Sequence, residues 1–289
     1  MTSPAATVPE GFWRHAAHVL EKNPVTLVAF VLFALLVVVA LFGPWLAPYD
    51  PLASNAARAL EPPSAAHWFG TDNLGRDVFS RVLVAARLDL AIAVAAVALA
   101  CAVGAALGAA AGYWGGWIDA AVGRLVDTIM AFPLFVLAMG IVAALGNTIE
   151  NIVYATAIIN LPFYARVVRA EVQIRKDTGF AQAARLAGNT DLRVLALHVF
   201  PNALPALMVQ ISLNMGWAIL NAAGLSFIGL GVRPPTPEWG IMVAEGANFI
   251  VSGEWWLAIF PGLALMLAVF TFNLLGDGLR DIVDPRQRS

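Results

Sequence analysis

The chain has 289 residues, of which 60% are hydrophobic and only 12% are charged, and its formal net charge is −2. Soluble proteins carry about 25% charged residues. The apolar residues here also form long blocks, so the composition excludes an ordinary soluble protein and predicts an integral membrane protein. No basic stripe indicates a nucleic-acid binder, the single cysteine excludes a disulfide within the chain, and no GxxxxGK[ST] motif indicates an ATP site.

Long uncharged stretches predict the transmembrane helices, because a helix needs about 20 apolar residues to cross the hydrocarbon core. The first stretch, residues 23–49, is longer than the apolar region of a signal peptide, so we interpret it as an uncleaved anchor. Pro201 and Pro205 break the start of a longer uncharged stretch, which leaves a span near 204–226. The other predicted spans are residues 90–118, 128–149, 151–170 and 255–276.

The charge distribution predicts which side of the membrane each end faces. Six Lys and Arg residues lie between Arg166 and Arg193, which favours the cytoplasmic side, and the N-terminal tail carries Arg14 and Lys22. The chain must therefore cross the membrane at 151–170, although the uncharged part of this stretch is short. The sequence predicts an all-α integral membrane protein with six transmembrane helices and with its N- and C-termini in the cytoplasm.

Glycines recur every four positions in the second predicted span, at Gly104, Gly108 and Gly112. Small residues at this spacing let two helix backbones approach each other closely in lipid. We therefore expect this face to pack against a neighbouring helix, and the pattern carries no information on cargo.

Several polar side chains lie at membrane depth, where an unsatisfied polar group is costly. They are Asn160, Gln210, Asn214, Asn221 and Asn273. Such residues either form hydrogen bonds between helices or line a translocation pathway. Asn214 and Asn221 are seven positions apart and share one helix face, so they and Gln210 are the candidate pathway residues.

Two predicted outer loops are substantial, roughly residues 47–86 and 227–254. Pro and Gly punctuate both loops, and their Trp residues suit a membrane interface. The loops either cap the helix bundle or form the docking surface for an external partner. The candidate docking residues are Asp72, Arg76, Asp77, Pro234 and Trp239.

Residues 179–205, GFAQAARLAGNTDLRVLALHVFPNALP, predict two short helices on the cytoplasmic side. Phe180, Ala183, Ala184 and Ala187 share one helical face, which is small enough for close packing. Gly188 follows where a left-handed C-terminal cap belongs.

The second of these helices is expected to begin with Thr190 or Asp191 as its N-cap and to end at Pro201. It would place Leu192, Leu195 and Val199 on one side. The pair of helices is either a hairpin lying on the membrane or a rigid plug for a cytoplasmic partner. A chain that has no ATP site but has such a plug can take its energy from an attached ATPase.

The same segment resembles the EAA loop of binding-protein-dependent ABC importer permeases. That loop reads Glu-Ala-Ala, followed by Gly, His, Pro and Asn at fixed distances. Here Gln182-Ala183-Ala184 is followed by Gly188, His198, Pro201 and Asn202 at those distances. The chain departs from the pattern at Gln182, where Glu is usual, and at Phe200, where Leu is usual. By this resemblance the residues that couple to the ATPase are Gln182, Ala183, Ala184, Arg185, Gly188, Asp191, His198 and Pro201.

Longer motifs narrow the resemblance to the dipeptide/oligopeptide/nickel group and to its DppC/OppC-type subunit. They run in order from about residue 12 to residue 288 and include HWFGTDNLGRDVFSRV, LSFIGLGVRPPTPEWG and FPGLALMLAVFTFNLLGDGLRDIVDPR. The resemblance implies a type I ABC importer (MetI-like) permease fold in the bacterial inner membrane. We expect a tail, first helix and outer loop in residues 1–86, a five-helix core in 87–280 and a cytoplasmic tail in 281–289.

The resemblance also implies partners and the absence of catalysis in this chain. The expected partners are a second, DppB-like permease, one or two ABC ATPase subunits that hold ATP and Mg, and an extracytoplasmic substrate-binding protein. No cofactor is expected in the chain itself, and its histidines form no cluster for a metal. The implied cargo is dipeptides or oligopeptides, with nickel chelates, glutathione, opines and oligosaccharides as alternatives.

Two functions of other classes compete with this interpretation. A secondary transporter or channel would work alone, would not need the 179–205 segment, and would be expected to bury ionisable coupling residues in its spans. A purely structural subunit of a membrane complex would have no polar pathway and no dependence on ATP.

Overall fold

The computed structural model describes residues 23–283, and within this range all regular elements are helices. The N-terminal tail with Arg14 and Lys22 and the last six residues lie outside the described residues. The elements in chain order are α2 (Pro24–Leu46), η1 (Ala56–Arg58), α3 (Val78–Trp114), α4 (Gly116–Met130), α5 (Leu134–Leu145), α6 (Ile149–Arg175), α7 (Gly179–Leu186), α8 (Asp191–Val194), η2 (Leu195–Val199), η3 (Phe200–Ala203), α9 (Leu204–Phe227), α10 (Trp239–Ala247) and α11 (Trp256–Val283).

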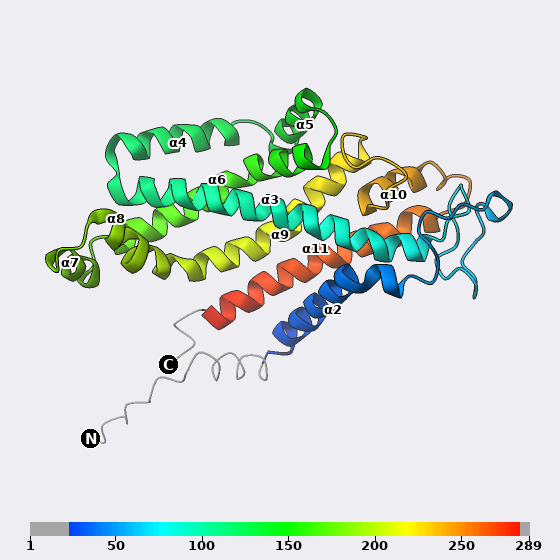
Figure 1. Cartoon of the computed structure of the whole chain (residues 1–289), viewed down its shortest axis with the longest axis horizontal. Coiled ribbons are helices and arrows are strands. Elements are labelled where there is room, and N and C mark those ends of the chain that lie inside the picture. Colours follow the sequence, from blue (N-terminus) through cyan, green and yellow to red (C-terminus); the bar gives the residue numbers. More distant parts are fainter. Residues whose placement is uncertain (1–22, 284–289) are drawn as a thin grey trace, which may run out of the picture.

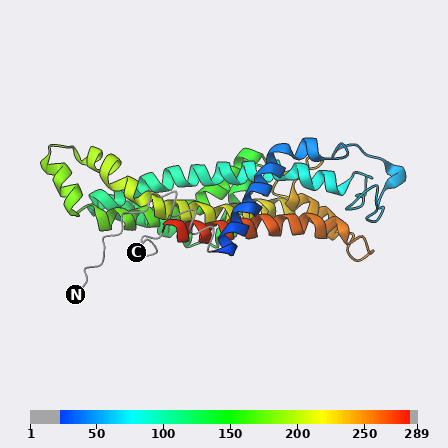
Figure 2. The same cartoon turned by 90° about the horizontal axis from the view of Figure 1, so that it is seen from below.

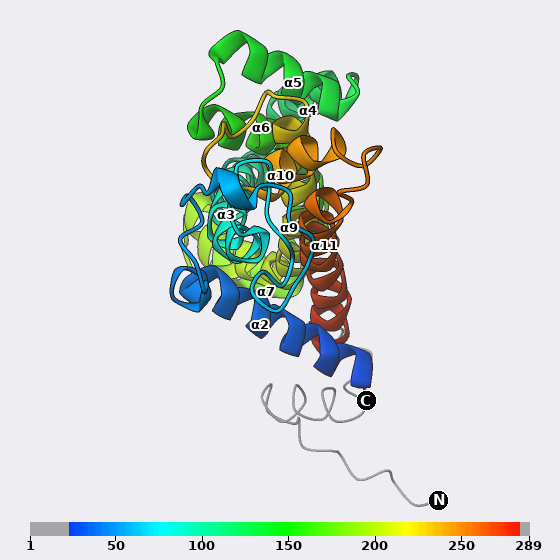
Figure 3. The ribbon, with the colours of Figure 1, turned by 90° about the vertical axis from the view of Figure 1, so that its right-hand side faces the viewer.

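The long helices form an elongated bundle with two distinct ends (Figure 1 and Figure 2). Helices α3, α6, α9 and α11 run along the bundle, and α2 packs across α3 and α11. The short helices α7 and α8 lie at one end, and the loop before α3 and helix α10 lie at the other. Figure 3 looks onto this second end, where the loop covers the tips of the long helices.

Five helical stretches are long and apolar enough to cross a membrane, namely α2, α3, α6, α11 and the continuous run from α8 to α9. Helices α4 and α5 pass the same test together, but they meet at an angle of 88°. Counted as one broken span, this pair brings the number to six, as the sequence predicts. The helical pattern therefore agrees with a multi-pass membrane protein.

The most extensive helix contact in the bundle joins α3 to α6 through the predicted glycine face. A Cβ atom placed on Gly104 would lie 2.7 Å from the carbonyl oxygen of Leu161, and one on Gly112 would lie 2.6 Å from that of Arg169. At Gly108 the backbone of Ala165 is closer still. Because the neighbours are backbone atoms, a larger residue would force the helices apart, so α3 and α6 form a rigid pair.

Several predicted boundaries are wrong. Helix α3 begins at Val78, so the expected limit between residues 86 and 87 lies inside a helix. The expected span at 128–149 is divided by a break before Pro133, and α6 continues to Arg175 instead of ending near residue 170. The second short helix is expected to end at Pro201, but the helical path continues there, because η2 and η3 connect α8 to α9.

Candidate functional site

The turn between α7 and α8 has the left-handed cap that the sequence predicts. Gly188 has a φ angle of +85°, and its N–H donates to the carbonyl of Arg185 over 2.9 Å. The next N–H, of Asn189, donates to the carbonyl of Ala184 over 3.3 Å. These two bonds make a Schellman motif, which satisfies the last carbonyls of α7 and fixes the direction in which the chain leaves it.

One side of the short helices is buried and the other is exposed. Ala181 and Ala184 of α7 join Val194, Leu195 and Val199 in the main buried cluster. The expected packing face is therefore only partly right, because Phe180, Ala183 and Ala187 are exposed. Leu186 and Leu192 are also exposed, so the residues from α7 to η3, here called the α7–η3 segment (179–203), present apolar side chains outward.

Most residues of the EAA pattern lie on this outward side. Gln182 and Asp191 are exposed, as is Pro201 at the start of η3, whereas His198 is half-buried. The Gln182 side chain donates to the carbonyl of Asp177 over 3.0 Å, so the amide that stands in place of the usual carboxylate is bonded to the loop just before α7. The carbonyl of His198 accepts from the side chain of Asn202 over 2.7 Å.

A residue that the sequence analysis did not single out joins two members of this pattern. The hydroxyl of Tyr113, at the end of α3, donates to Asp191 over 2.9 Å and accepts from Arg185 at 3.2–3.3 Å. Tyr113 directly follows Gly112 of the predicted glycine face, but nothing in its spacing connects it with the α7–η3 segment. Only the fold brings these three side chains together.

The three predicted pathway residues line one cavity of about 370 Å³ between α6, α9 and α11. Gln210 donates to the side-chain oxygen of Asn214 over 3.0 Å, while Asn221 donates to the carbonyl of Trp217 in its own helix. The side-chain nitrogen of Asn214 is buried and has no hydrogen-bond partner among the described residues. Asn160 of α6 and Asn273 of α11 line the same cavity, so all the polar residues noted at membrane depth meet there.

A second, wider cavity of about 700 Å³ lies along the same three helices toward the α7–η3 segment. Its charged lining residues are Glu171, Arg175 and Arg280, and Pro201 and Asn202 form part of its rim. The groove between α6 and α9 thus carries uncharged amides in one part and charged side chains in the part next to the segment.

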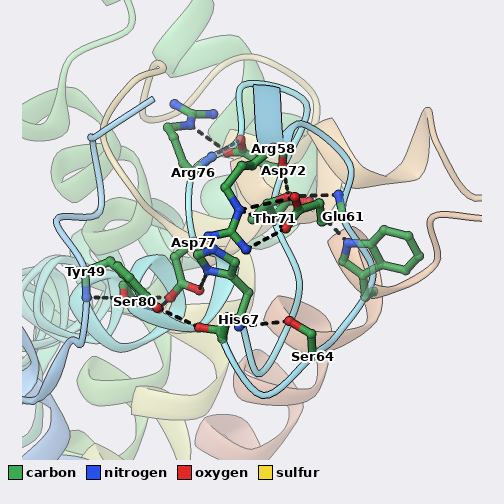
Figure 4. A network of polar contacts seen from close by, with 12 residues as sticks. Tyr49, Arg58, Glu61, Ser64, His67, Thr71, Asp72, Arg76, Asp77 and Ser80 are labelled. Carbon is green, nitrogen blue, oxygen red and sulfur yellow. Dashed lines mark hydrogen bonds and ion pairs between the residues drawn. The ribbon is translucent and has the colours of Figure 1, made fainter. Parts of the chain in front are cut away.

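The candidate docking residues of the first outer loop are buried at the opposite end of the bundle (Figure 4). Arg76 donates to Asp72 over 2.6 Å, and Arg81 lies 3.6 Å from the same carboxylate. The Asp77 carboxylate accepts from the N–H of Ser80 over 2.8 Å, which caps α3, and lies 2.8 Å from the His67 ring nitrogen. These contacts hold the loop against the start of α3.

Trp239, the candidate from the second loop, is buried as well. Its N–H donates to Asp89 over 3.1 Å, and its indole nitrogen donates to the carbonyl of Val82 over 3.0 Å. Glu238 beside it accepts from the N–H groups of Gly240 and Ile241 and caps α10, and burial raises the pKa of its carboxyl group. We call residues 47–77 together with α10 the loop cap.

The burial of Asp72, Arg76, Asp77 and Trp239 corrects the expectation that these side chains contact an external partner. They hold the loop cap together instead, and of the five candidates only Pro234 is exposed. Within residues 23–283, no group of three or more His, Cys, Asp or Glu residues lies close enough together to hold a metal ion.

Comparison with known proteins places the chain in a family. The family described as "Binding-protein-dependent transport system inner membrane component" matches residues 104–289, and the "N-terminal TM domain of oligopeptide transport permease C" matches residues 11–63. A solved structure, "Inward facing conformations of the MetNI methionine ABC transporter", covers 71% of this chain and 96% of its own with a TM-score of 0.58. At 16% identity this likeness shows the fold alone, and it confirms the MetI-like architecture.

Curated relatives match over nearly the whole chain. The dipeptide transport system permease protein DppC of Alkalihalophilus pseudofirmus is 42% identical over 277 residues, which cover 96% of this chain and 91% of the relative. The probable D,D-dipeptide transport system permease protein DdpC of Escherichia coli is 43% identical over 267 residues, or 92% of this chain and 89% of the relative. The glutathione transport system permease protein GsiD of Escherichia coli is 43% identical over 279 residues, or 95% of this chain and 89% of the relative.

These matches confirm the resemblance drawn from the motifs and the placement in the bacterial inner membrane. The chain belongs to the inner-membrane permease components of binding-protein-dependent transport systems, as a DppC/OppC-type subunit of an ABC importer.

Proposed function

We propose that this chain forms half of the pathway through which an ATP-driven importer carries dipeptides or short oligopeptides. Two of the relatives at 42% and 43% identity are named for dipeptide transport, which supports this cargo class. The relative named for glutathione keeps glutathione as the first alternative cargo, ahead of nickel chelates, opines and oligosaccharides. The other half of the pathway is a DppB-like permease, and an extracytoplasmic binding protein delivers the cargo.

The chain is non-catalytic in this proposal and binds no cofactor of its own. One or two ABC ATPase subunits hold ATP and Mg and contact the α7–η3 segment, which faces the cytoplasm together with both termini. The observation that carries this assignment is the exposed apolar surface of the segment. Phe180, Leu186 and Leu192 point outward from short helices whose other side is fixed in the bundle. An exposed apolar patch on a firmly held element suits a protein partner.

The cavity lined by Gln210, Asn214 and Asn221 is the proposed pathway wall. Amide side chains can both donate and accept hydrogen bonds, so they suit the peptide groups of a passing peptide without retaining it as a fixed charge would. The exposed part of the second outer loop around Pro234 is the proposed contact for the binding protein.

The coupling assignment is tested by straining Gly188 without removing any side chain. Its φ of +85° is unfavourable for a β-branched residue, while no neighbouring atom lies within 4 Å of the position of an added Cβ. Gly188→Val should therefore lower ATP-dependent peptide uptake by about tenfold through backbone strain alone, which costs roughly 1–3 kcal/mol. Membrane insertion should persist, because the buried side of the segment is unchanged.

Two matched variants separate strain from bulk. Gly188→Asn should retain uptake, because Asn tolerates the left-handed region. Gly179→Val adds the same bulk at the start of α7, where space is open and φ is not positive, and should also retain uptake. Wild-type uptake by the assembled Gly188→Val complex would overturn the coupling role of the segment. Uptake by the wild-type chain alone, without an ATPase, would favour the stand-alone transporter.

A further inference from the structure

Helix α7 packs mainly on α8 and η2, that is, within the α7–η3 segment itself, although η3 continues directly into α9. A force applied to α7 by an ATPase must nevertheless reach the helices that border the pathway. A residue of a long helix that binds several parts of the segment at once would transmit such a force.

Tyr113 has this position. It is the penultimate residue of α3, it directly follows Gly112, and its ring is buried. Through Gly104, Gly108 and Gly112, α3 is in backbone contact with α6, which lines the pathway cavity. Anything that displaces Tyr113 therefore acts on the rigid pair of α3 and α6.

Three separate parts of the chain from the end of α6 to α8 bind this one residue. Lys176, directly after α6, donates to the Tyr113 carbonyl over 3.2 Å. Arg185 of α7 donates to the Tyr113 hydroxyl, and its guanidinium carbon lies 5.4 Å from the centre of the ring. Asp191 at the start of α8 accepts from the same hydroxyl over 2.9 Å. The contacts thus lie on both sides of the Gly188 turn.

The Tyr113 hydroxyl suits the opposite charges of its two partners. A tyrosine hydroxyl can donate one hydrogen bond and accept another, so it bridges a cation and an anion that are themselves 3.7 Å apart. Both charged partners are partly exposed, with 34% and 62% of their side chains accessible, so removing the hydroxyl leaves no charge stranded in the interior. Tyr113→Phe should accordingly fold and keep the ring packed.

We propose that Tyr113 is a positioning residue that transmits movement of the α7–η3 segment to the α3–α6 pair by holding Arg185 and Asp191 with its hydroxyl. This rests on the proposed function, because it assumes that an ATPase moves the segment. Tyr113 lies outside the EAA pattern and touches neither the nucleotide nor the proposed pathway cavity. Loss of its hydroxyl should therefore uncouple ATP hydrolysis from transport, while the ATPase and the pathway themselves stay intact.

The test uses the complete importer in liposomes with its binding protein and with radiolabelled dialanine or glutathione, whichever the wild type takes up. Cargo molecules imported per ATP hydrolysed are measured for wild type and Tyr113→Phe, together with the melting temperature and the ATPase content of the complex. The hydroxyl's hydrogen bonds to two charged groups are lost, so the ratio should fall about tenfold. Basal ATP hydrolysis, melting temperature and subunit content should remain close to wild type.

Two further variants sharpen the result. Tyr154→Phe removes a hydroxyl from an exposed tyrosine of α6 that forms no side-chain hydrogen bond within residues 23–283, and should keep the wild-type ratio. The double variant Tyr113→Phe with Asp191→Ala should be no worse than the worse of its two single variants, because both changes remove the same bond.

The possible outcomes distinguish this inference from the proposed function. An unchanged ratio in Tyr113→Phe overturns the inference and leaves the proposed function intact. A lower ratio that comes with loss of the ATPase from the complex also overturns it, since Tyr113 would then hold the docking surface in place. No uptake of either cargo by the wild-type complex would overturn the proposed function instead.

Discussion

At the loop cap, the charged side chains of Arg76 and Asp77 are 2% and 3% exposed, whereas at the α7–η3 segment the apolar side chains of Leu186 and Leu192 are 90% and 65% exposed. The usual distribution of polar and apolar groups is thus reversed at both ends. In the loop cap the buried side chain of Arg76 is bonded to Asp72, and that of Asp77 is bonded to His67 and Ser80. In the segment the exposed apolar groups lack a partner within the described residues, and in the proposed function an ATPase subunit covers them.

Stability and function should therefore depend on different ends of the bundle. Removal of one member of a buried charged pair leaves the other member uncompensated. Substitutions in the loop cap should therefore lower the stability of the chain. Exposed apolar side chains contribute little to the folded chain, so the segment should be sensitive in assembly and transport. Four substitutions test this division, beginning with the largest expected effect.

Asp77→Ala should cause the largest loss of stability. The carboxylate caps α3 and binds the side chains of His67 and Ser80, all in a buried position. Its removal should cost about 3–5 kcal/mol, as for other broken buried pairs, and should lower the melting temperature of the purified complex. Asp50→Ala, which removes an exposed aspartate bonded only to a loop N–H, should have little effect. Equal melting temperatures for the two variants would contradict the division.

Leu186→Ser and Leu192→Ser should show the opposite behaviour at the other end. Because both side chains are exposed, the stability of the chain itself should change by no more than about 0.5 kcal/mol. Co-purification of the ATPase and ATP-dependent uptake should nevertheless decrease severalfold, since the proposed interface loses apolar area. Val251→Ser, at an equally exposed apolar residue on the loop-cap side, should retain the ATPase. A normal amount of ATPase bound to both leucine variants would remove the basis for this interface.

Glu238→Gln should have the smallest effect, visible chiefly in the dependence of stability on pH. Burial raises the pKa of Glu238 in the folded chain above its ordinary value of 4.5, so the folded state holds this proton more tightly than the unfolded state. Its contribution to stability is therefore complete below about pH 4.5 and is lost as the pH rises through the raised value. Below about pH 4.5 the substitution should cost about 1 kcal/mol, because one of the two α10 cap bonds is lost.

The measurement is the melting temperature of the complex across this pH range. The variant should show a flatter profile than wild type, while Glu254→Gln on the neighbouring exposed loop should keep the wild-type slope. A profile for Glu238→Gln that parallels wild type would show that this carboxyl does not carry the effect.

The sequence predicts the parts of the fold that depend on local hydropathy. The α2, α9 and α11 helices coincide with uncharged stretches, and the close contact of α3 with α6 follows from the glycine spacing. The start of α3 could not be predicted in the same way, because Arg81 and Asp89 look like loop residues. Their charges are compatible with a helix only because distant segments surround them, namely Asp72 and the N–H of Trp239.

The candidate site was predictable to a similar degree. Gly188 and the polar residues of α9 follow from turn chemistry and helical periodicity, which are local properties. Which alanines of α7 are buried depends on how the whole segment packs against α6 and α9. A helical face of small residues does not by itself indicate which neighbour it contacts. The role of Tyr113 depends on contacts between residues about 70 positions apart along the chain, and no single-sequence pattern encodes such a contact.

The length of α3 has a mechanical consequence. Its 37 residues extend over about 55 Å at a rise of about 1.5 Å per residue, well beyond the ~30 Å of the hydrocarbon core. The helix is capped by Asp77 at one tip and carries Tyr113 at the other. It is therefore a stiff arm that protrudes from the bilayer, and a tilt of about 5° about one tip displaces the other by about 5 Å, close to one helical turn. A small rotation about one tip would in this way give a side-chain-sized displacement of the other tip, with no bending of the arm.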